Sequence, residues 1–419
     1  MKIFIMGLSP YARNRGVAAI TSVLLVNLIR AFPNAEIVMW GGYPEPPLHS
    51  PTSLYYKILR ERKRTKIKVF HEPWERMAYS FRHQINRTFL QLIYAFTKIS
   101  KDCITAEILD SDIVLSFNYG DCFSDLHGIF RDIIVILRNY IPIFANKKLV
   151  FGPQTIGPFR YKAAKYLAIN ILNSSKIKYV LPRELMSVIF LMKYLKDNKK
   201  IVFCPDLAFL LEPSYDSLTE IPSQAFEKGY IVTAFDPHMM GSISDYSKVV
   251  KILAQALGDF IKITGKYVVF IPEATTPAGL DCMKVAEDVK RLLPSKITDS
   301  IIVLKDKHTA EELKGLINYS ELVISTFTHA LITGLSCGVP VIGISYNVPK
   351  MRQILSLFDM ENNVLKPSDV YASPDNLVKK AMDLTKNSDL RYNLQMKAEK
   401  VKHIIEKQFI SILFDMRSL

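Results

Sequence analysis

Residues suited to acid–base chemistry gather in one stretch of the sequence, Leu322–Lys350. His329 lies within it, after an apolar run typical of a buried strand and close to Ser325 and Thr328. A histidine in the first turn of a helix lies at the positive end of the helix dipole, which lowers its pKa and attracts anions. His329 is therefore a candidate functional residue, and the two hydroxyl side chains are candidates to face the substrate. A histidine with a purely structural role is the alternative.

Cationic side chains follow other apolar runs and predict an anionic substrate. Arg183 comes directly after one such run, and Lys350 and Arg352 come shortly after Val341–Ile344. An arginine at the end of a strand can bind a carboxylate or phosphate through two parallel N–H groups. We expect these three side chains to bind the anionic group, and we expect Tyr346 to line the same site.

Three loops add substrate-binding candidates. Asn14 and Gly16 open a predicted helix, where a glycine lets an anion approach the backbone. Gln154 and Thr155 stand between two Gly-Pro pairs, which predict a rigid loop between a strand and a helix. The carboxylate of Asp125 could orient sugar hydroxyls, or it could equally cap a turn.

Short apolar runs alternate with helical patterns in both halves of the chain, which indicates an α/β protein with parallel sheets covered by helices. Thr309 and Glu312 have the spacing of a capping box at the start of one helix. The expected strands are Lys2–Met6, Ala35–Trp40, Asp112–Phe117, Leu149–Phe151, Lys178–Leu181, Lys200–Phe203, Tyr230–Ala234, Tyr267–Ile271, Ile301–Leu304, Leu322–Ser325 and Val341–Ile344.

The length of 419 residues exceeds one ordinary core, so we predict two Rossmann-like domains that face a cleft. The first covers residues 1–212 and is the expected acceptor side. A linker rich in Pro and Ser covers 213–229, the second domain covers 230–390, and a helical tail covers 391–419. Ligands of open α/β sheets bind beyond the carboxyl ends of the strands, where the candidate residues lie.

The stretch Leu322–Pro349 contains no Asp, Glu, Lys or Arg and is long enough to span a membrane. Glycines, prolines and His329 interrupt it, however, and a strand–helix–strand unit in a parallel sheet has the same uncharged profile. We predict the buried unit.

Lys and Arg outnumber Asp and Glu by 54 to 40, a formal charge of +14, which favours anionic partners. A solvated basic loop and peripheral contact with an anionic membrane are both compatible with the densest cluster. The apolar face within Ile85–Ile99 predicts a helix packed on the first domain, with a membrane-surface helix as the alternative. No zinc-finger or RNA-recognition motif accompanies the charge, so we do not expect nucleic acid to be a partner. The cluster comprises Arg60, Arg62, Lys63, Arg64, Lys66 and Lys68.

The five cysteines are scattered and form no C-x-x-C pair. This spacing suggests neither a disulfide framework nor a zinc site, and we expect no metal. Reduced, unpaired cysteines are typical of cytoplasmic proteins, so the expected location is the cytoplasm, at or near the inner face of the membrane.

At these residues the chain resembles the polysaccharide pyruvyl transferase family. The most specific match is Pro153–Phe159, which reads Pro-Gln-Thr-Ile-Gly-Pro-Phe and is similar to the family's Pro-Gln-Ser-Ile-Gly-Pro-Phe. The resemblance spans most of the chain and keeps its spacing. The other matching positions, in order, are Arg183 with Ser187, Pro205-Asp206, His329, Gly338–Ile342, Ser345-Tyr346 and Lys350.

The resemblance implies a fold similar to the two-domain GT-B glycosyltransferases and a reaction that needs no cofactor. Such enzymes transfer the carboxyvinyl carbons of phosphoenolpyruvate to a sugar of a cell-surface polysaccharide or its lipid-linked precursor, giving a pyruvate ketal. By resemblance, His329 is the acid–base residue and Arg183 binds the donor. The family's Arg-Leu-His triplet is Phe327-Thr328-His329 in this chain, so its donor-binding arginine is missing.

Two other functions fit the same residues. A GT-B glycosyltransferase would use a nucleotide sugar across the same cleft, but the sequence shows no evident acidic pair for the nucleotide ribose. A divergent member that binds glycan without turnover is the third hypothesis. Release of phosphate from phosphoenolpyruvate, as opposed to release of a nucleoside diphosphate, distinguishes the first two.

Overall fold

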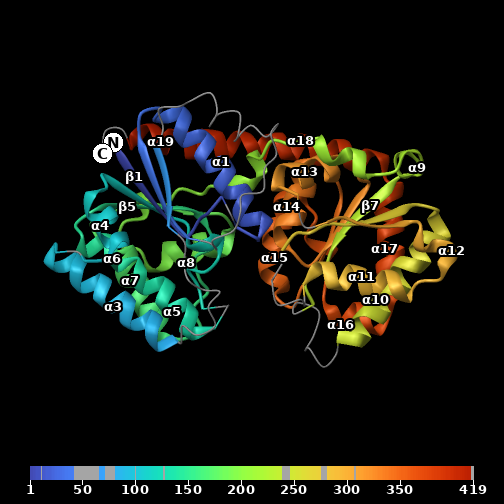
Figure 1. The fold of residues 1–419 in the computed structure, drawn as a ribbon, viewed down its shortest axis with the longest axis horizontal. Coiled ribbons are helices and arrows are strands. Elements are labelled where there is room, and N and C mark those ends of the chain that lie inside the picture. Colours follow the sequence, from blue (N-terminus) through green and yellow to red (C-terminus); the bar gives the residue numbers. More distant parts are fainter. Residues whose placement is uncertain are drawn as a thin grey trace.

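The computed structural model describes residues 1–10, 12–41, 66–70, 81–99, 101–125, 128–237, 246–274, 281–305 and 308–416. It contains two six-stranded sheets, one in each half of the chain, and all the strand pairs are parallel (Figure 1). The first sheet has the order β3-β2-β1-β4-β5-β6. Its strands are β1 (Lys2–Met6), β2 (Glu36–Trp40), β3 (Lys66–Phe70), β4 (Ile113–Ser116), β5 (Lys148–Gln154) and β6 (Ile177–Pro182).

The second sheet repeats the pattern with the order β12-β11-β10-β7-β8-β9. Most of its strand residues are buried because helices cover both faces, which explains the almost unbroken apolar sequence of these strands. The strands are β7 (Tyr230–Ala234), β8 (Tyr267–Phe270), β9 (Ile301–Val303), β10 (Leu322–Ser325), β11 (Val341–Ile344) and β12 (Val364–Leu365).

The helices of the first half separate onto the two faces of its sheet. Ile3 and Ile5 of β1 join a core with α1, whereas Phe4 and Met6 join a core with α3 to α8. Alternate residues of a strand point to opposite faces, so one strand serves both cores. These helices are α1 (Arg15–Ala31), α3 (Phe81–Thr97), α4 (Cys103–Asp110), α5 (Ile129–Arg138), α6 (Tyr140–Phe144), α7 (Lys162–Leu172) and α8 (Leu185–Tyr194).

The second half begins with a short helix and ends with helices that return to the first half. Figure 1 shows α18 running from the second sheet toward the first, with α19 beside the first. Tyr179 Oη donates a 3.0 Å hydrogen bond to Asp415, which fixes this return. The helices are α9 (Ser223–Lys228), α10 (Tyr246–Thr264), α11 (Cys282–Leu292), α12 (Ser295–Thr298), α13 (Ala310–Asn318), α14 (Thr328–Ser336), α15 (Val348–Leu355), α16 (Pro367–Ala372), α17 (Pro374–Lys386), α18 (Ser388–Ile405) and α19 (Ser411–Asp415).

The predicted fold class is confirmed: the chain forms two Rossmann-like domains of the GT-B-like type, whose strand ends meet at their junction. The uncharged stretch forms β10, α14 and β11, as predicted. Among the described residues, no helix combines the length and apolar character needed to cross a membrane. The capping box at Thr309 is also present.

Three local predictions differ from the structure. Lys200–Phe203 makes only an isolated bridge from Ile201 to Val180, so it is not a strand of the sheet. Strand β3 was not predicted, because its alternating Lys-Ile-Lys-Val-Phe resembles part of the basic cluster. Of that cluster, Arg60, Arg62, Lys63 and Arg64 lie outside the described residues. The predicted linker contains α9, so this connection is partly helical.

Candidate active site

The loop between β10 and α14 is held by its own hydroxyl groups. Ser325 is fully buried; its Oγ donates to the carbonyl of Ala234 at 2.8 Å and accepts from the amide of Phe327 at 2.9 Å. Thr326 Oγ1 accepts from the amide of Asp236 at 2.7 Å. These bonds fix where α14 begins, and they place the half-buried Thr328 at its first position. Ser325 is thus used within the loop, and Thr328 is the hydroxyl that remains at the helix start.

His329 lies in the first turn of α14 and packs against the start of α1, in the other domain. A β-carbon on Gly16 would lie 2.0 Å from Cγ of His329, so only glycine fits there. Nδ1 of His329 is buried and has no hydrogen-bond partner among the described residues. Burial lowers the pKa of His329, with the charges of Asp206 and Arg183 as smaller and opposing influences. The imidazole is therefore neutral near pH 7 and available as a base.

The start of α1 joins the two domains through backbone contacts. Asn14 caps the helix, because its Oδ1 accepts from the amides of Gly16 at 2.9 Å and Val17 at 3.2 Å. The amide of Arg15 donates to the carbonyl of Glu273 at 2.9 Å, and Asn14 pairs with Ala274 in an isolated bridge. The first amides of α1 are thus bonded within the protein, and Asn14 acts as the helix cap in this structure.

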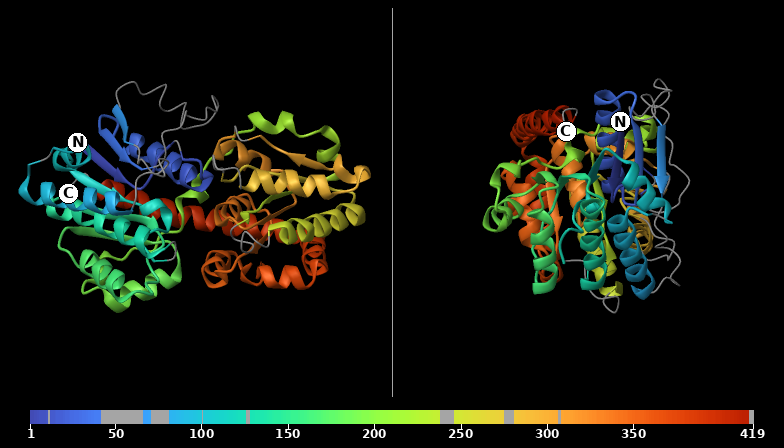
Figure 2. Two further views of the ribbon diagram at one scale, coloured as in Figure 1. Left: turned by 60° about the horizontal axis from the view of Figure 1, so that its bottom comes forward. Right: turned by 90° about the vertical axis from the view of Figure 1, so that its left-hand side faces the viewer.

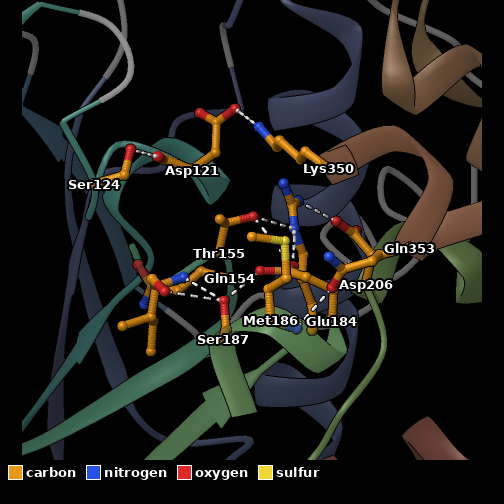
Figure 3. Close-up of polar contacts among 12 residues, drawn as sticks. Asp121, Ser124, Gln154, Thr155, Glu184, Met186, Ser187, Asp206, Lys350 and Gln353 are labelled. Carbon is orange, nitrogen blue, oxygen red and sulfur yellow. Dashed lines mark hydrogen bonds and ion pairs between the residues drawn. The ribbon is translucent and has the colours of Figure 1, made fainter. Parts of the chain in front are cut away.

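Arg183 lies at the end of β6 and is 2% exposed. Its Nη1 donates to Asp206 at 2.5 Å and its Nε donates to Thr155 Oγ1 at 3.1 Å. Thr155 Oγ1 in turn donates to Glu184 at 3.2 Å (Figure 3). The remaining N–H groups of Arg183 bond to none of the residues that the structure describes. Two positions of the guanidinium are therefore fixed, and the others remain for a ligand.

The loop between Gly152-Pro153 and Gly157-Pro158 is held in place by buried hydrogen bonds. Gln154 is fully buried; its Nε2 donates to the carbonyl of Ser116 at 2.6 Å, and its Oε1 accepts from Asn118 at 2.9 Å. Ser187 Oγ accepts from the amide of Ile156 at 2.8 Å and donates to Glu184. Gln154 therefore holds strand ends together, whereas Thr155 reaches the Arg183 cluster.

Lys350 crosses from the second domain to the first. Its Nζ lies 2.5 Å from Asp121, a residue 229 positions earlier in the sequence (Figure 3). Both side chains are largely buried, and their charges act on the pKa of His329. Lys350, Arg183 and His329 therefore belong to one electrostatic cluster at the junction of the domains.

The remaining predicted residues lie at or beyond the edge of this cluster. Arg352 and Tyr346 are exposed, with Tyr346 at 57%. Asp125 is buried and accepts from the amide of Tyr161 at 2.7 Å, so it binds the loop that precedes α7.

Glu273, at the end of β8, is a further residue of the junction that was not among the predicted site residues. It is 5% exposed, and burial raises its pKa to about 7, although the nearby charge of Arg15 lowers it. Its position after a buried strand is the feature of the sequence that could have identified it as a site residue, and the same feature marks Asp206 and Asp121. Among the described residues no cluster of three or more His, Cys, Asp and Glu side chains could hold a metal ion.

Comparisons with known proteins agree with this architecture. The model of the polysaccharide pyruvyl transferase family matches residues 14–348. No curated protein sequence matches the chain. Three solved structures resemble the fold at low sequence identity, which supports the fold alone. They are a UDP-GlcNAc 2-epimerase from Methanocaldococcus jannaschii (TM-score 0.54, 12% identity, 97% of this chain and 100% of that chain), UGT2 from Phytolacca americana with UDP-2-fluoroglucose and pterostilbene (0.54, 10%, 98% and 98%), and an Anabaena protein with UDP and glucose (0.53, 12%, 98% and 99%).

Proposed function

Because the chain belongs to the polysaccharide pyruvyl transferase family and is a transferase, we propose that phosphoenolpyruvate is its donor and that a pyruvate ketal on a sugar is its product. The observation that supports this best is the position of His329. Its imidazole has a lowered pKa and an unbonded Nδ1, and it lies in one cluster with Arg183 and Lys350. A base beside two cations suits a trianionic donor and a hydroxyl nucleophile.

The reaction needs two bonds to form at one carbon. A proton adds to the methylene C3 of phosphoenolpyruvate, and a sugar hydroxyl bonds to C2 as it loses its own proton to a base. A second hydroxyl of the same sugar then bonds to C2 and gives its proton to the departing phosphate, while the C2–O bond to phosphate breaks and inorganic phosphate leaves with that electron pair. We assign His329 as the base for the hydroxyl, because a neutral imidazole can accept that proton.

Lys350 and Arg183 are proposed to bind the phosphate and carboxylate of the donor. The Lys350–Asp121 pair is largely buried, with 17% and 24% of the two side chains exposed. The donor phosphate is proposed to replace Asp121 as the partner of Lys350, because a phosphate carries more negative charge than a carboxylate. Lys350 would then supply the positive charge that is missing because Phe327 stands where the family has an arginine. Arg352, at the edge of the site, is proposed as a further cation that binds the donor.

The acceptor is proposed to be a sugar of a cell-surface polysaccharide or its lipid-linked precursor, modified at the cytoplasmic face of the membrane. Proteins that bind UDP together with a sugar group share the fold, since UGT2 was solved with UDP-2-fluoroglucose and the Anabaena protein with UDP and glucose. For this chain we propose phosphoenolpyruvate instead, on the strength of the family match. No cofactor is required for the proton transfers described.

The proposal is tested by incubating the protein with phosphoenolpyruvate and a lipid-linked sugar and measuring inorganic phosphate. His329→Ala should lower kcat by at least about 100-fold, with thermal unfolding and phosphoenolpyruvate binding largely unchanged. His403→Ala is the matched control, since this histidine is exposed on α18 and should be dispensable. Unchanged turnover in His329→Ala would reject the catalytic assignment. Release of a nucleoside diphosphate from a nucleotide sugar, without phosphate release from phosphoenolpyruvate, would reject the donor.

A further inference from the structure

Helix α3 turns an apolar face toward solvent. Phe89 is 50% exposed, Ile93 55% and Phe96 72%, whereas Leu92 of the same helix is buried. The prediction that this helix packs on the first domain is confirmed by Leu92 and Ala95, which join its core, but the phenylalanines of the same apolar face remain exposed. Clustered exposed apolar side chains on a folded protein mark a binding surface, because water solvates them poorly.

The exposed side chains of α3 border a groove. Residues of α5, α6 and α7 complete its walls, and the groove encloses about 440 Å³. Its lining is apolar throughout, and the rings of Phe96 and Phe144 meet edge to face with centroids 6.2 Å apart. Phe144 is itself 40% exposed. The full lining is Phe89, Leu92, Ile93, Phe96, Leu137, Tyr140, Phe144 and Leu167.

Lysines surround one end of this groove. Nζ of Lys98 donates to the carbonyl of Phe144 at 2.5 Å, at the end of α6. Burial and the charges of Lys147 and Lys176 lower the pKa of Lys98, so the three ammonium groups lie close enough to repel one another. None of the three forms an ion pair with a carboxylate among the described residues. The rim thus carries positive charge, of which Asp110 offsets only a part through its electrostatic interaction with Lys147.

We propose that the α3 groove and its rim of Lys98, Lys147 and Lys176 dock the protein on an anionic phospholipid bilayer. The phenylalanines would enter the interface between headgroups and acyl chains, while the lysines bind lipid phosphates. A second copy of the chain fits this surface poorly, because each copy carries a formal charge of +14 and the lysines would face further positive charge. The inference does not depend on the proposed reaction.

The apolar part of the surface is tested with Phe96→Asp. Sedimentation with vesicles of phosphatidylglycerol and phosphatidylcholine in equal parts should show affinity weaker by at least about tenfold. Ile263→Asp is the matched control, because Ile263 is 59% exposed on α10 in the other domain. It should bind as the wild type does. Equal binding of Phe96→Asp and wild type overturns the proposal.

The charged part is tested with the triple variant Lys98→Glu, Lys147→Glu and Lys176→Glu. Its affinity for the same vesicles should fall by at least about 100-fold, and wild-type binding should weaken with added salt. A control variant with the same change in net charge replaces three exposed lysines of the second domain, Lys251, Lys296 and Lys386, by Glu.

Three results contradict the bilayer proposal. The first is an equal loss of affinity in the control triple variant, which means that net charge alone drives binding. The second is equal binding of the wild type to pure phosphatidylcholine. The third is a dimer in light scattering that Phe96→Asp dissociates, which assigns the groove to self-association. In each variant, the midpoint of thermal unfolding should equal that of the wild type, which shows that the fold is intact.

Discussion

His329 and Glu273 both contact the start of α1, and burial moves their pKa values in opposite directions. Burial lowers the pKa of His329 and raises that of Glu273 to about 7. Near neutral pH the site therefore holds a neutral imidazole and a carboxyl that is partly protonated. Environments that shift the pKa values of two neighbouring groups in opposite directions are typical of sites that transfer protons.

The pH dependence of turnover follows from the direction of the His329 shift. Its pKa lies below 6.5, so the neutral base persists as the pH falls to that value. We expect kcat/KM to decline only below about pH 6.5, as the imidazole becomes protonated. A profile of phosphate release against pH measures this. A decline that begins well above pH 6.5 would contradict the assignment of His329 as the base.

Glu273 predicts a stability effect of the opposite sign to an ordinary ion pair. The unfolded carboxyl ionises near its usual pKa of 4.5 and the folded one near 7, so stability falls as the pH rises between these values. Glu273→Gln removes the cost and should stabilise the protein by up to about 3 kcal/mol at about pH 8, with little gain at about pH 4. Urea denaturation at both pH values measures the difference, and an equal change at both would be inconsistent with it.

At the scale of elements, the site depends on two helix starts that come from different domains. The first turn of α1 lies against the first turn of α14, and Gly16 is the residue that permits this contact. Asn14 caps α1, while the bonded hydroxyls of Ser325 and Thr326 set the start of α14. The position of His329 is thus fixed by the helices and their loops and needs no bond of its own.

Gly16→Ala tests that contact. The added methyl group would lie 2.0 Å from Cγ of His329, so the imidazole must move. Because the methyl would also lie 2.7 Å from Cβ of His329, we expect a lower midpoint of thermal unfolding together with a loss of about 100-fold in kcat/KM. Gly258→Ala is the control, since its new methyl meets only the movable ends of two side chains, Leu293 at 2.8 Å and Ile297 at 3.5 Å. Full activity in Gly16→Ala would show that His329 need not stay where the structure places it.

At the scale of the whole molecule, the C-terminal helices connect the two domains. Figure 2 shows the domains side by side, with the red C-terminal segment from α18 to α19 extending from one to the other. One core includes Ile20 of α1, Leu331 of α14, Val401 of α18 and Leu413 of α19. The segment from α18 to α19 therefore helps to set the distance between the two halves of the site.

Phe409→Ala should weaken this connection. Phe409 is 2% exposed between α18 and α19, and removing a buried phenyl ring costs about 3–5 kcal/mol. Phe414→Ala is the control, because Phe414 is 51% exposed and should change stability by about 0.5 kcal/mol or less. Urea denaturation of both variants gives the comparison. Similar midpoints for the two would indicate that the C-terminal segment adds little to the shared core.

The sequence alone determined those features that depend on local pattern. Short apolar runs between helical stretches predicted ten of the strands of the two sheets. This worked because a strand that is buried on both faces is apolar at successive positions, whereas a helix repeats its apolar residues every three or four positions. The capping box at Thr309 was visible for the same reason, since its residues are neighbours in the chain. The residues at the strand ends could be picked out as candidates, because parallel strands present their carboxyl ends at one edge.

Only the tertiary structure decided which candidates meet. Lys350 and Asp121 are 229 positions apart, and Gly16 and His329 belong to different domains, so no local pattern could pair them. The structure also showed that two predicted site residues have different surroundings. Gln154 uses its side-chain amide to hold strand ends together, whereas His329 keeps a nitrogen without a hydrogen bond among the described residues. The same holds for α3, which packs on the first domain as predicted but leaves Phe89, Ile93 and Phe96 exposed. Helical periodicity fixes which residues share a face, but the packing of the whole chain determines whether that face meets protein or solvent.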